Sequence, residues 1–104
     1  MKIQFNTDSS IQGSEKLKTY FTDVISEQLR RFSDHITRVE VHLSDVNGEK
    51  ESPNDKRCLL EARIEGRKPI AVTSLANTHE KAISGATDKI MKSLDKIFGR
   101  LKDH

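Results

Sequence analysis

The chain opens with a short alternation of apolar and polar positions and continues with a longer, helical period. In residues 2–7, Ile3 and Phe5 fall on one side of an extended segment and polar residues on the other, which predicts a strand. Over residues 14–32, apolar residues recur at three- and four-residue steps, which is typical of an amphipathic helix. Ser14 is well placed to cap the start of this helix.

Two further segments alternate with a period of two and predict half-buried strands over 36–46 and 56–66. The inward positions are Val39, Val41 and Leu43 in the first segment and Cys58, Leu60, Ala62 and Ile64 in the second. The polar run between them contains Asn47-Gly48 and Ser52-Pro53-Asn54-Asp55, which are turn-forming sequences. We therefore expect a hairpin with a long loop.

The last third of the chain predicts a tight turn, a strand and a long helix. Gly66 begins the turn, and residues 69–75 form the strand. Asn77 can cap the helix, with Glu80 completing a capping box. The apolar period then continues nearly to the end of the chain, through Ala82, Ile83, Ala86, Ile90, Met91, Leu94, Ile97, Phe98 and Leu101.

The predicted order is β-α-β-β-β-α, within a single domain of residues 1–104. A right-handed βαβ crossover places the first strand parallel to the second, and the later strands follow as an antiparallel meander. Each strand has one apolar face and each helix one apolar stripe. We therefore expect an α/β two-layer sandwich, with both helices on one face of a four-stranded mixed sheet, a topology similar to that of double-stranded-RNA-binding modules.

The composition suits a compact domain, with 34% hydrophobic and 33% charged residues. No run approaches 18 apolar residues and no secretion signal is present, so we expect no membrane partner and a cytoplasmic, monomeric protein. A lone cysteine, Cys58, predicts a core residue and no disulfide. The four histidines have neither metal-ligand spacing nor a catalytic motif around them, and they are His35, His42, His79 and His104. We expect no catalytic residue, no metal and no cofactor.

The net charge of +2 is small, so the distribution of charge decides what it implies. On a helical wheel the basic residues of the last helix fall on one side, away from its apolar stripe, and they are Lys81, Lys89, Lys92, Lys96 and Arg100. This basic stripe is roughly 28 Å long at 1.5 Å per residue, enough to face several phosphates of a nucleic acid. The alternative interpretation is an ordinary solvated face.

Other basic positions give weaker signals. Gly85 falls on the same side of the wheel as the lysines, where bare backbone would let a phosphate approach, although glycine is also tolerated on a solvated face. Arg30 and Arg31 lie off the apolar stripe of the first helix but are interleaved with acidic residues. The exposed sheet face predicts charge pairing of Arg38 with Glu40 and of Arg63 with Glu61 and Glu65. It lacks the stacking aromatics of sheets that bind single-stranded RNA.

Three long segments carry a family resemblance, namely RFSDHITRVEVHLSD (31–45), NDKRCLLEARIEGRKPIAVT (54–73) and KAISGATDKIMKSLDKIFGRLKD (81–103). They resemble the ribosome hibernation-promoting factor and ribosome-associated inhibitor family over essentially the whole chain. The resemblance implies the same fold and binding to 16S rRNA of the small (30S) ribosomal subunit between head and body. Binding there overlaps the tRNA and mRNA positions and inhibits translation in stationary phase or stress. The family's basic positions match at Lys81, Lys89, Lys92, Lys96, Arg30, Arg31 and Arg100.

Long members of that family carry a second, C-terminal domain that pairs ribosomes, whereas this sequence stops at His104 and resembles the short form. A truncated long member would have the same sequence, so this alternative stays open. The resemblance then implies that pairing of 70S ribosomes into 100S particles needs a separate modulation factor. The alternative function is a protein–protein adaptor whose lysines meet an acidic partner, for example in sigma factor modulation.

Overall fold

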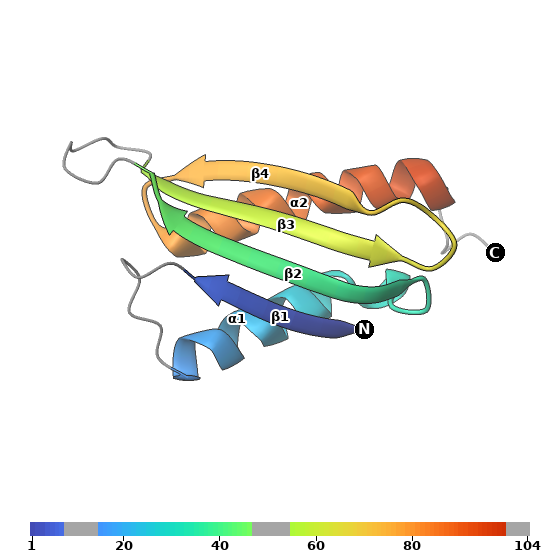
Figure 1. The fold of residues 1–104 in the computed structure, drawn as a ribbon, viewed down its shortest axis with the longest axis horizontal. Helices are drawn as coiled ribbons and strands as arrows, with labels where there is room; N and C mark the ends of the chain where they lie inside the picture. Colours follow the sequence, from blue (N-terminus) through green and yellow to red (C-terminus); the bar gives the residue numbers. More distant parts are fainter. Residues whose placement is uncertain (8–14, 47–54, 100–104) are drawn as a thin grey trace.

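The computed structural model describes residues 1–7, 15–46 and 55–99. The elements follow the predicted order β-α-β-β-β-α, with one extra 3-10 turn, η1, after the first helix (Figure 1). They are β1 (Lys2–Thr7), α1 (Glu15–Gln28), η1 (Arg30–Phe32), β2 (Ile36–Asp45), β3 (Lys56–Ile64), β4 (Ile70–Ala76) and α2 (His79–Phe98).

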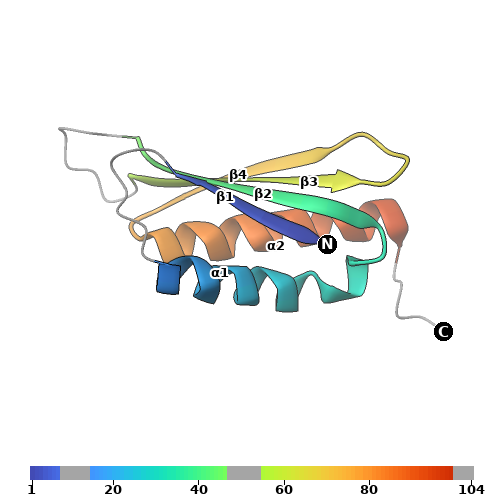
Figure 2. The same cartoon turned by 60° about the horizontal axis from the view of Figure 1, so that its bottom comes forward.

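The four strands form one mixed sheet in the order β1-β2-β3-β4. β1 runs parallel to β2, while β2 with β3 and β3 with β4 are antiparallel. Both helices lie on the same face of the sheet (Figure 2), so the predicted two-layer sandwich is confirmed. None of the helices in the described part of the chain is long and apolar enough to cross a bilayer.

The core lies between the sheet and the helices and contains the predicted inward positions. Val41 pairs with Phe5 of β1 on one side and with Leu60 of β3 on the other, so apolar side chains line up across the strands. Val41, Leu60 and Cys58 have no exposed surface. The apolar stripe of α2 covers them with fully buried Ile90 and Leu94. Each such aliphatic side chain contributes roughly 1.5–3 kcal/mol through burial.

The first helix ends earlier than residue 32, where the sequence predicted its end. α1 stops at Gln28, and η1 follows with bonds from the Phe32 N–H to the Leu29 carbonyl at 2.9 Å and from the Ser33 N–H to the Arg30 carbonyl at 3.1 Å. Side chains three residues apart eclipse in a 3-10 turn. Leu29 and Phe32 can therefore both reach the core, and both are 0% exposed.

The start of the last helix also differs from the prediction. The N-cap of α2 is Thr78, whose hydroxyl accepts a hydrogen bond from the Lys81 N–H at 3.1 Å, so the prediction of Asn77 as cap and of a capping box with Glu80 was wrong. β4 spans 70–76 instead of 69–75, and Pro69 precedes it because proline has no N–H for the ladder. The Gly66 turn is confirmed, with φ +75° and an Arg67 N–H to Ile64 carbonyl bond of 3.2 Å.

Some predictions fall outside the described residues. They concern the Ser14 cap, the turn sequences in 47–54, Arg100, Leu101 and His104. The ends of the β2–β3 hairpin are described, because Asp45 pairs with Lys56 and the Val46 N–H bonds to the Asp55 carbonyl at 2.9 Å.

Candidate nucleic-acid interface

Four lysines form an exposed face on α2, here called the lysine face, and they are Lys81, Lys89, Lys92 and Lys96. All four are exposed, as the helical wheel predicted. From Lys81 to Lys96 the face is about 22 Å long at the helical rise. Its length matches several successive phosphates of a nucleic-acid strand.

The charge of the lysine face is not neutralised by the described acidic residues. Among residues 1–7, 15–46 and 55–99, no carboxylate lies within the 4.0 Å of an ion pair from any of the four ammonium groups. Asp95, on the same helix, is engaged by Arg31 instead. The face therefore presents its positive charges to solvent, where they can meet an anionic partner.

Lys89 is held more firmly than the other three lysines. Its Nζ donates a hydrogen bond of 2.7 Å to the backbone carbonyl of Thr73 in β4. An ammonium group has three N–H donors, so two remain for a ligand. The bond places one end of this side chain at the outer edge of the sheet, because β4 is the last strand in the sheet order. The lysine face thus runs beside the edge of β4.

Gly85 is half-buried and lies against β4, so the prediction of bare backbone open to a phosphate was wrong. A Cβ atom built at position 85 would meet the Ser74 side chain, at 3.3 Å from its Cβ and closer still to its Oγ. The flank of α2 that carries Gly85 is therefore packed against β4. A helical wheel cannot show this contact, because it plots the residues of the helix alone and not the strand that lies beside it.

The two arginines of η1 have described carboxylate partners, whereas the four lysines of the lysine face have none. Arg31 Nη2 donates to both carboxylate oxygens of Asp95, at 2.8 and 3.0 Å, and so ties η1 to α2. Arg30 pairs with Glu27 at 2.8 Å, but both side chains are largely exposed, at 75% and 67%. Such an open pair contributes little to stability and exchanges easily for another anion. Arg31 is therefore less available to a new anionic partner than Arg30.

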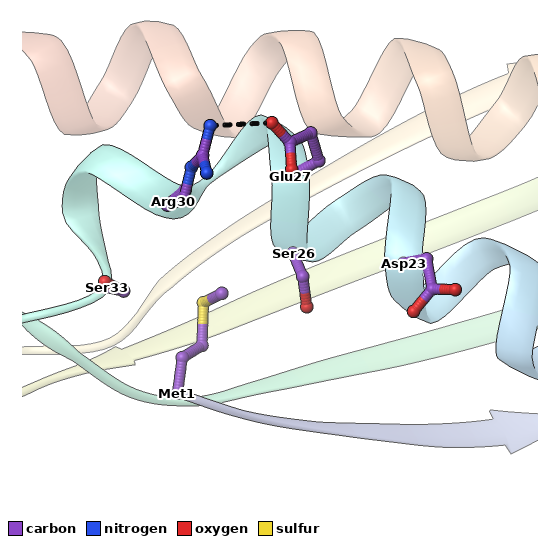
Figure 3. A pocket seen from close by; sticks show the side chains of 6 residues that line it. All are labelled: Met1, Asp23, Ser26, Glu27, Arg30 and Ser33. Carbon is purple, nitrogen blue, oxygen red and sulfur yellow. Dashed lines mark hydrogen bonds and ion pairs between the residues drawn. The ribbon is translucent and has the colours of Figure 1, made fainter.

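Arg30 and Glu27 lie in a shallow surface groove between α1 and the start of β1 (Figure 3). Its other lining residues are Met1, Asp23, Ser26 and Ser33. The carboxylates of Asp23 and Glu27 line this groove, and Glu27 already pairs with Arg30, so the groove is a poor binding site for phosphate.

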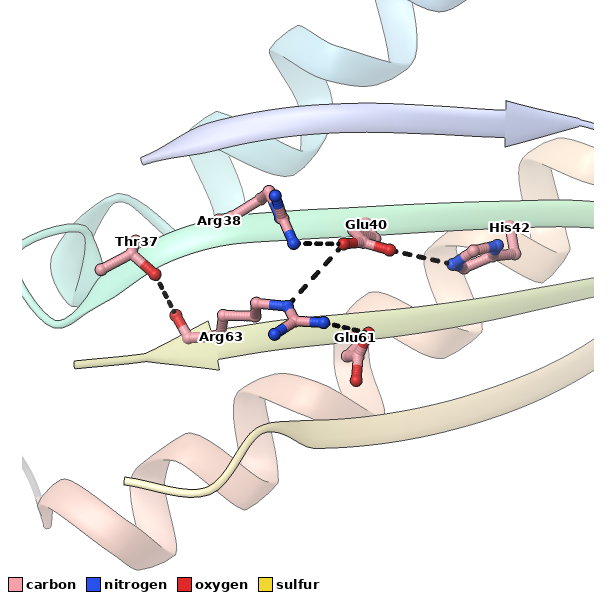
Figure 4. A network of polar contacts seen from close by, with 6 residues as sticks. All are labelled: Thr37, Arg38, Glu40, His42, Glu61 and Arg63. Atoms are coloured by element: carbon pink, nitrogen blue, oxygen red, sulfur yellow. Dashed lines mark hydrogen bonds and ion pairs between the residues drawn. The ribbon is translucent and has the colours of Figure 1, made fainter. Parts of the chain in front are cut away.

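The outer face of the sheet is occupied by its own charge network (Figure 4). Arg38 pairs with Glu40 at 2.8 Å and Arg63 with Glu61 at 3.9 Å, which confirms two predicted pairs. Arg63 also reaches Glu40 at 3.7 Å across the β2–β3 pair, and His42 Nε2 lies 3.4 Å from Glu40. The described Glu65 forms no ion pair with Arg63, so the pairing of these two residues was wrongly predicted.

Nothing in the described chain gathers ligands for a metal ion, since no three His, Cys, Asp or Glu side chains converge there. Cys58 is 0% exposed, as predicted for a core residue, and burial raises the pKa of its thiol to about 12. A thiol so protonated and enclosed is a poor nucleophile.

One group of side chains at the C-terminal end of α2 was not predicted, and we call it the Phe98 cluster: His35, Arg67 and Phe98. The His35 and Phe98 rings are stacked, with centroids 4.2 Å apart and an interplanar angle of 22°. The Arg67 guanidinium lies over the Phe98 ring, 5.2 Å from its centroid. Periodicity could not reveal this cluster, because its members come from three separate segments.

Comparison with known proteins adds to this geometry. Residues 4–102 match the family described as "Sigma 54 modulation protein / S30EA ribosomal protein". The fold is similar to the Protein Y N-terminal domain of Thermus thermophilus, with a TM-score of 0.73 and 17% identity over 93% of this chain and 99% of that one. A ribosomal subunit interface protein from Coxiella burnetii is similar with a TM-score of 0.70 and 16% identity over 96% and 100%. A comparison with curated protein sequences finds no match.

Proposed function

Because the chain belongs to the Sigma 54 modulation protein / S30EA ribosomal protein family, we propose that it is a ribosome hibernation factor. The family is one of ribosome-associated proteins and not of enzymes. In this proposal the protein acts in the cytoplasm, binds 16S rRNA of the small (30S) subunit at the tRNA and mRNA positions, and inhibits translation. Residues 1–104 act as one ribosome-binding domain, since the described strands and helices share a single core.

The observation that carries the proposal is the lysine face of α2, exposed along about 22 Å and without a described carboxylate partner. An RNA backbone that lies along it would release counterions as the ammonium groups replace them. Lysines used in this way supply affinity and orientation without reading sequence. Arg30 and Arg31 would add contacts only by exchanging Glu27 and Asp95 for phosphate. Arg100 stays a predicted contact outside the described residues.

The fold explains how such binding would inhibit translation. The sheet and its two helices form one packed body, and its lysine face would hold it against rRNA in one orientation. A tRNA or mRNA cannot occupy the same volume, so inhibition follows from occupancy and needs no chemical step.

The test is co-sedimentation of the protein with purified small subunits at several salt concentrations. The variant reverses three charges, Lys89→Glu, Lys92→Glu and Lys96→Glu. Its matched control reverses three exposed basic residues on other surfaces, Lys2→Glu, Lys16→Glu and Arg57→Glu, and so has the same net charge. We expect the native chain and the control to sediment with the subunits and the α2 variant to remain in the supernatant.

The slope of log affinity against log salt gives a second measure. It should be close to −0.7 to −0.9 per phosphate contacted, so that single Ala substitutions in the lysine face each reduce its magnitude by nearly one. Equal binding by the two charge-reversed variants would remove the lysine face from the site. If the native chain does not sediment with subunits at all, the proposed function is wrong.

A second candidate function is a protein–protein adaptor for an acidic partner, which the sigma 54 part of the family description favours. The same lysine face would then meet carboxylates. Incubation of the protein with purified sigma factor and small subunits together separates the two: in the hibernation proposal it co-sediments with subunits, whereas in the adaptor hypothesis it remains with the sigma factor. Pairing of 70S ribosomes into 100S particles would need a separate modulation factor, and sucrose-gradient profiles with and without that factor test this.

A further inference from the structure

The Phe98 cluster joins three parts of the fold at the end of the lysine face. Phe98 is the last residue of α2, His35 precedes β2, and Arg67 lies in the β3–β4 turn, which comes close to the C-terminal end of α2 (Figure 1). Backbone hydrogen bonds fix the two loops: the Glu65 N–H bonds to the His35 carbonyl at 3.0 Å, and the Arg67 N–H to the Ile64 carbonyl at 3.2 Å. The backbone that carries His35 and Arg67 is therefore fixed by hydrogen bonds.

Arg67 differs from most arginines of the described chain. Four of them, Arg30, Arg31, Arg38 and Arg63, form ion pairs with carboxylates. Arg67 is exposed, and no described carboxylate lies within ion-pair distance of it. Its guanidinium instead rests on the half-buried Phe98 ring, which also stacks on the His35 ring and contacts the Phe32 ring. None of the described residues engages the N–H donors of this guanidinium, and within the described part of the chain these donors are available to a ligand.

We propose that the Phe98 cluster is a binding site for an unpaired RNA base, which stacks on the outer face of the Arg67 guanidinium. This inference rests on the proposed function and adds to it a contact with a base. A planar guanidinium that already lies on an aromatic ring is ordered before the ligand arrives, so little conformational freedom is lost on binding. Unpaired RNA bases commonly stack on arginine planes and aromatic rings.

The position of the cluster fits this role. Lys96 and Phe98 both lie in the last turn of α2, but about 200° apart around the helix, so a strand whose phosphates follow the lysine face reaches the cluster by crossing the C-terminal end of α2. The lysines hold the backbone there, and Arg67 receives a base that has left the helical stack. On the outer sheet face, by contrast, the two guanidinium groups of the Glu40 network, those of Arg38 and Arg63, are both paired with carboxylates.

The experiment separates the plane of Arg67 from its charge by measuring affinity for purified small subunits over a range of salt concentrations. Arg67→Lys keeps the charge and loses the plane, Arg67→Trp keeps a plane and loses the charge, and Arg67→Ala loses both. The matched control is Arg57→Ala, which removes another exposed arginine without a described carboxylate partner, from the outer face of β3. Thermal unfolding of each variant checks that the fold is kept.

We expect Arg67→Ala and Arg67→Lys to lower the affinity about tenfold at every salt concentration, with the slope unchanged, because a stacked base releases no phosphate counterion. Arg67→Trp should recover most of that loss. The chain has no natural tryptophan, so the tryptophan fluorescence of this variant comes from position 67 alone. This fluorescence should be quenched on binding. Arg57→Ala should bind like the native chain.

Two results would overturn the inference while leaving the proposed function intact. Native affinity for Arg67→Lys, together with a slope reduced by nearly one for Arg67→Ala, would show a phosphate contact only. Native affinity for all three Arg67 variants would show that the cluster only closes the end of the core. A native chain that binds no small subunits would refute the proposed function and this inference together.

Discussion

Gly85 of α2 packs against Ser74 of β4 so closely that a Cβ atom at position 85 would lie 3.3 Å from the Ser74 Cβ and nearer still to its Oγ. The contact sets how closely the last helix approaches the edge strand. One helical turn further on, Lys89 reaches the Thr73 carbonyl at 2.7 Å. The position of the lysine face therefore depends on residue 85 being glycine, because a side chain there would collide with the side chain of Ser74.

The first prediction concerns this contact. Alanine is favoured over glycine inside a helix by about 1 kcal/mol, yet we expect Gly85→Ala to destabilise the protein because the new methyl group displaces Ser74. In a Ser74→Ala background the Oγ clash is gone, and the same substitution should cost less or become stabilising. Urea unfolding of the four proteins in this double-mutant cycle gives the coupling free energy between positions 74 and 85. A coupling free energy of zero would show that the Ser74 side chain rotates out of the way.

The second prediction concerns the Arg31–Asp95 bridge. Asp95→Asn removes the partner of Arg31 and one carboxylate from the helix that carries the lysine face. The unfolding free energy should fall by less than about 1 kcal/mol, since the two side chains are 36% and 40% exposed. The affinity for small subunits should rise, with a steeper salt dependence, because Arg31 becomes available to phosphate. Weaker binding would instead show that the bridge holds Arg31 in its binding position.

The third prediction concerns Cys58. Burial raises the pKa of its thiol from 9.0 to about 12, so the folded chain holds this proton more tightly than the unfolded chain. The resulting stabilisation is fully present below about pH 9 and is lost as the pH rises from there towards 12. Urea unfolding of the native chain should therefore lose more free energy between about pH 8 and 10.5 than that of Cys58→Ala. Parallel pH profiles of the two proteins would contradict this.

The fourth prediction concerns the start of α2. Thr78→Ala should lower the unfolding free energy by about 1 kcal/mol, because the Lys81 N–H loses its acceptor. Thr78→Ser keeps that acceptor and should retain most of the stability. Asn77→Ala serves as the matched comparison and should have little effect. If Asn77→Ala proves as costly as Thr78→Ala, the assignment of the cap is wrong.

Much of the candidate site could be read from α2 alone. The helical period predicted which side of α2 turns to the core, and the exposure of Lys81, Lys89, Lys92 and Lys96 confirms it. The same wheel misplaced Gly85, because it treats everything away from the apolar stripe as solvent. It likewise could not show that Arg31 meets Asp95 or that Lys89 meets the Thr73 carbonyl.

The topology, the inward positions of the strands and the charge of the last helix could all be predicted from the sequence. These follow from alternation and helical period, which depend only on neighbouring residues and fixed backbone geometry. The folded chain was needed to show that Arg31 pairs with Asp95, which flank of α2 touches β4, and that His35, Arg67 and Phe98 meet. These contacts join different elements, some of them far apart in the sequence, as Arg31 and Asp95 are at 64 positions, and they depend on how the layers pack. A periodic pattern of neighbouring residues cannot show contacts between separate elements.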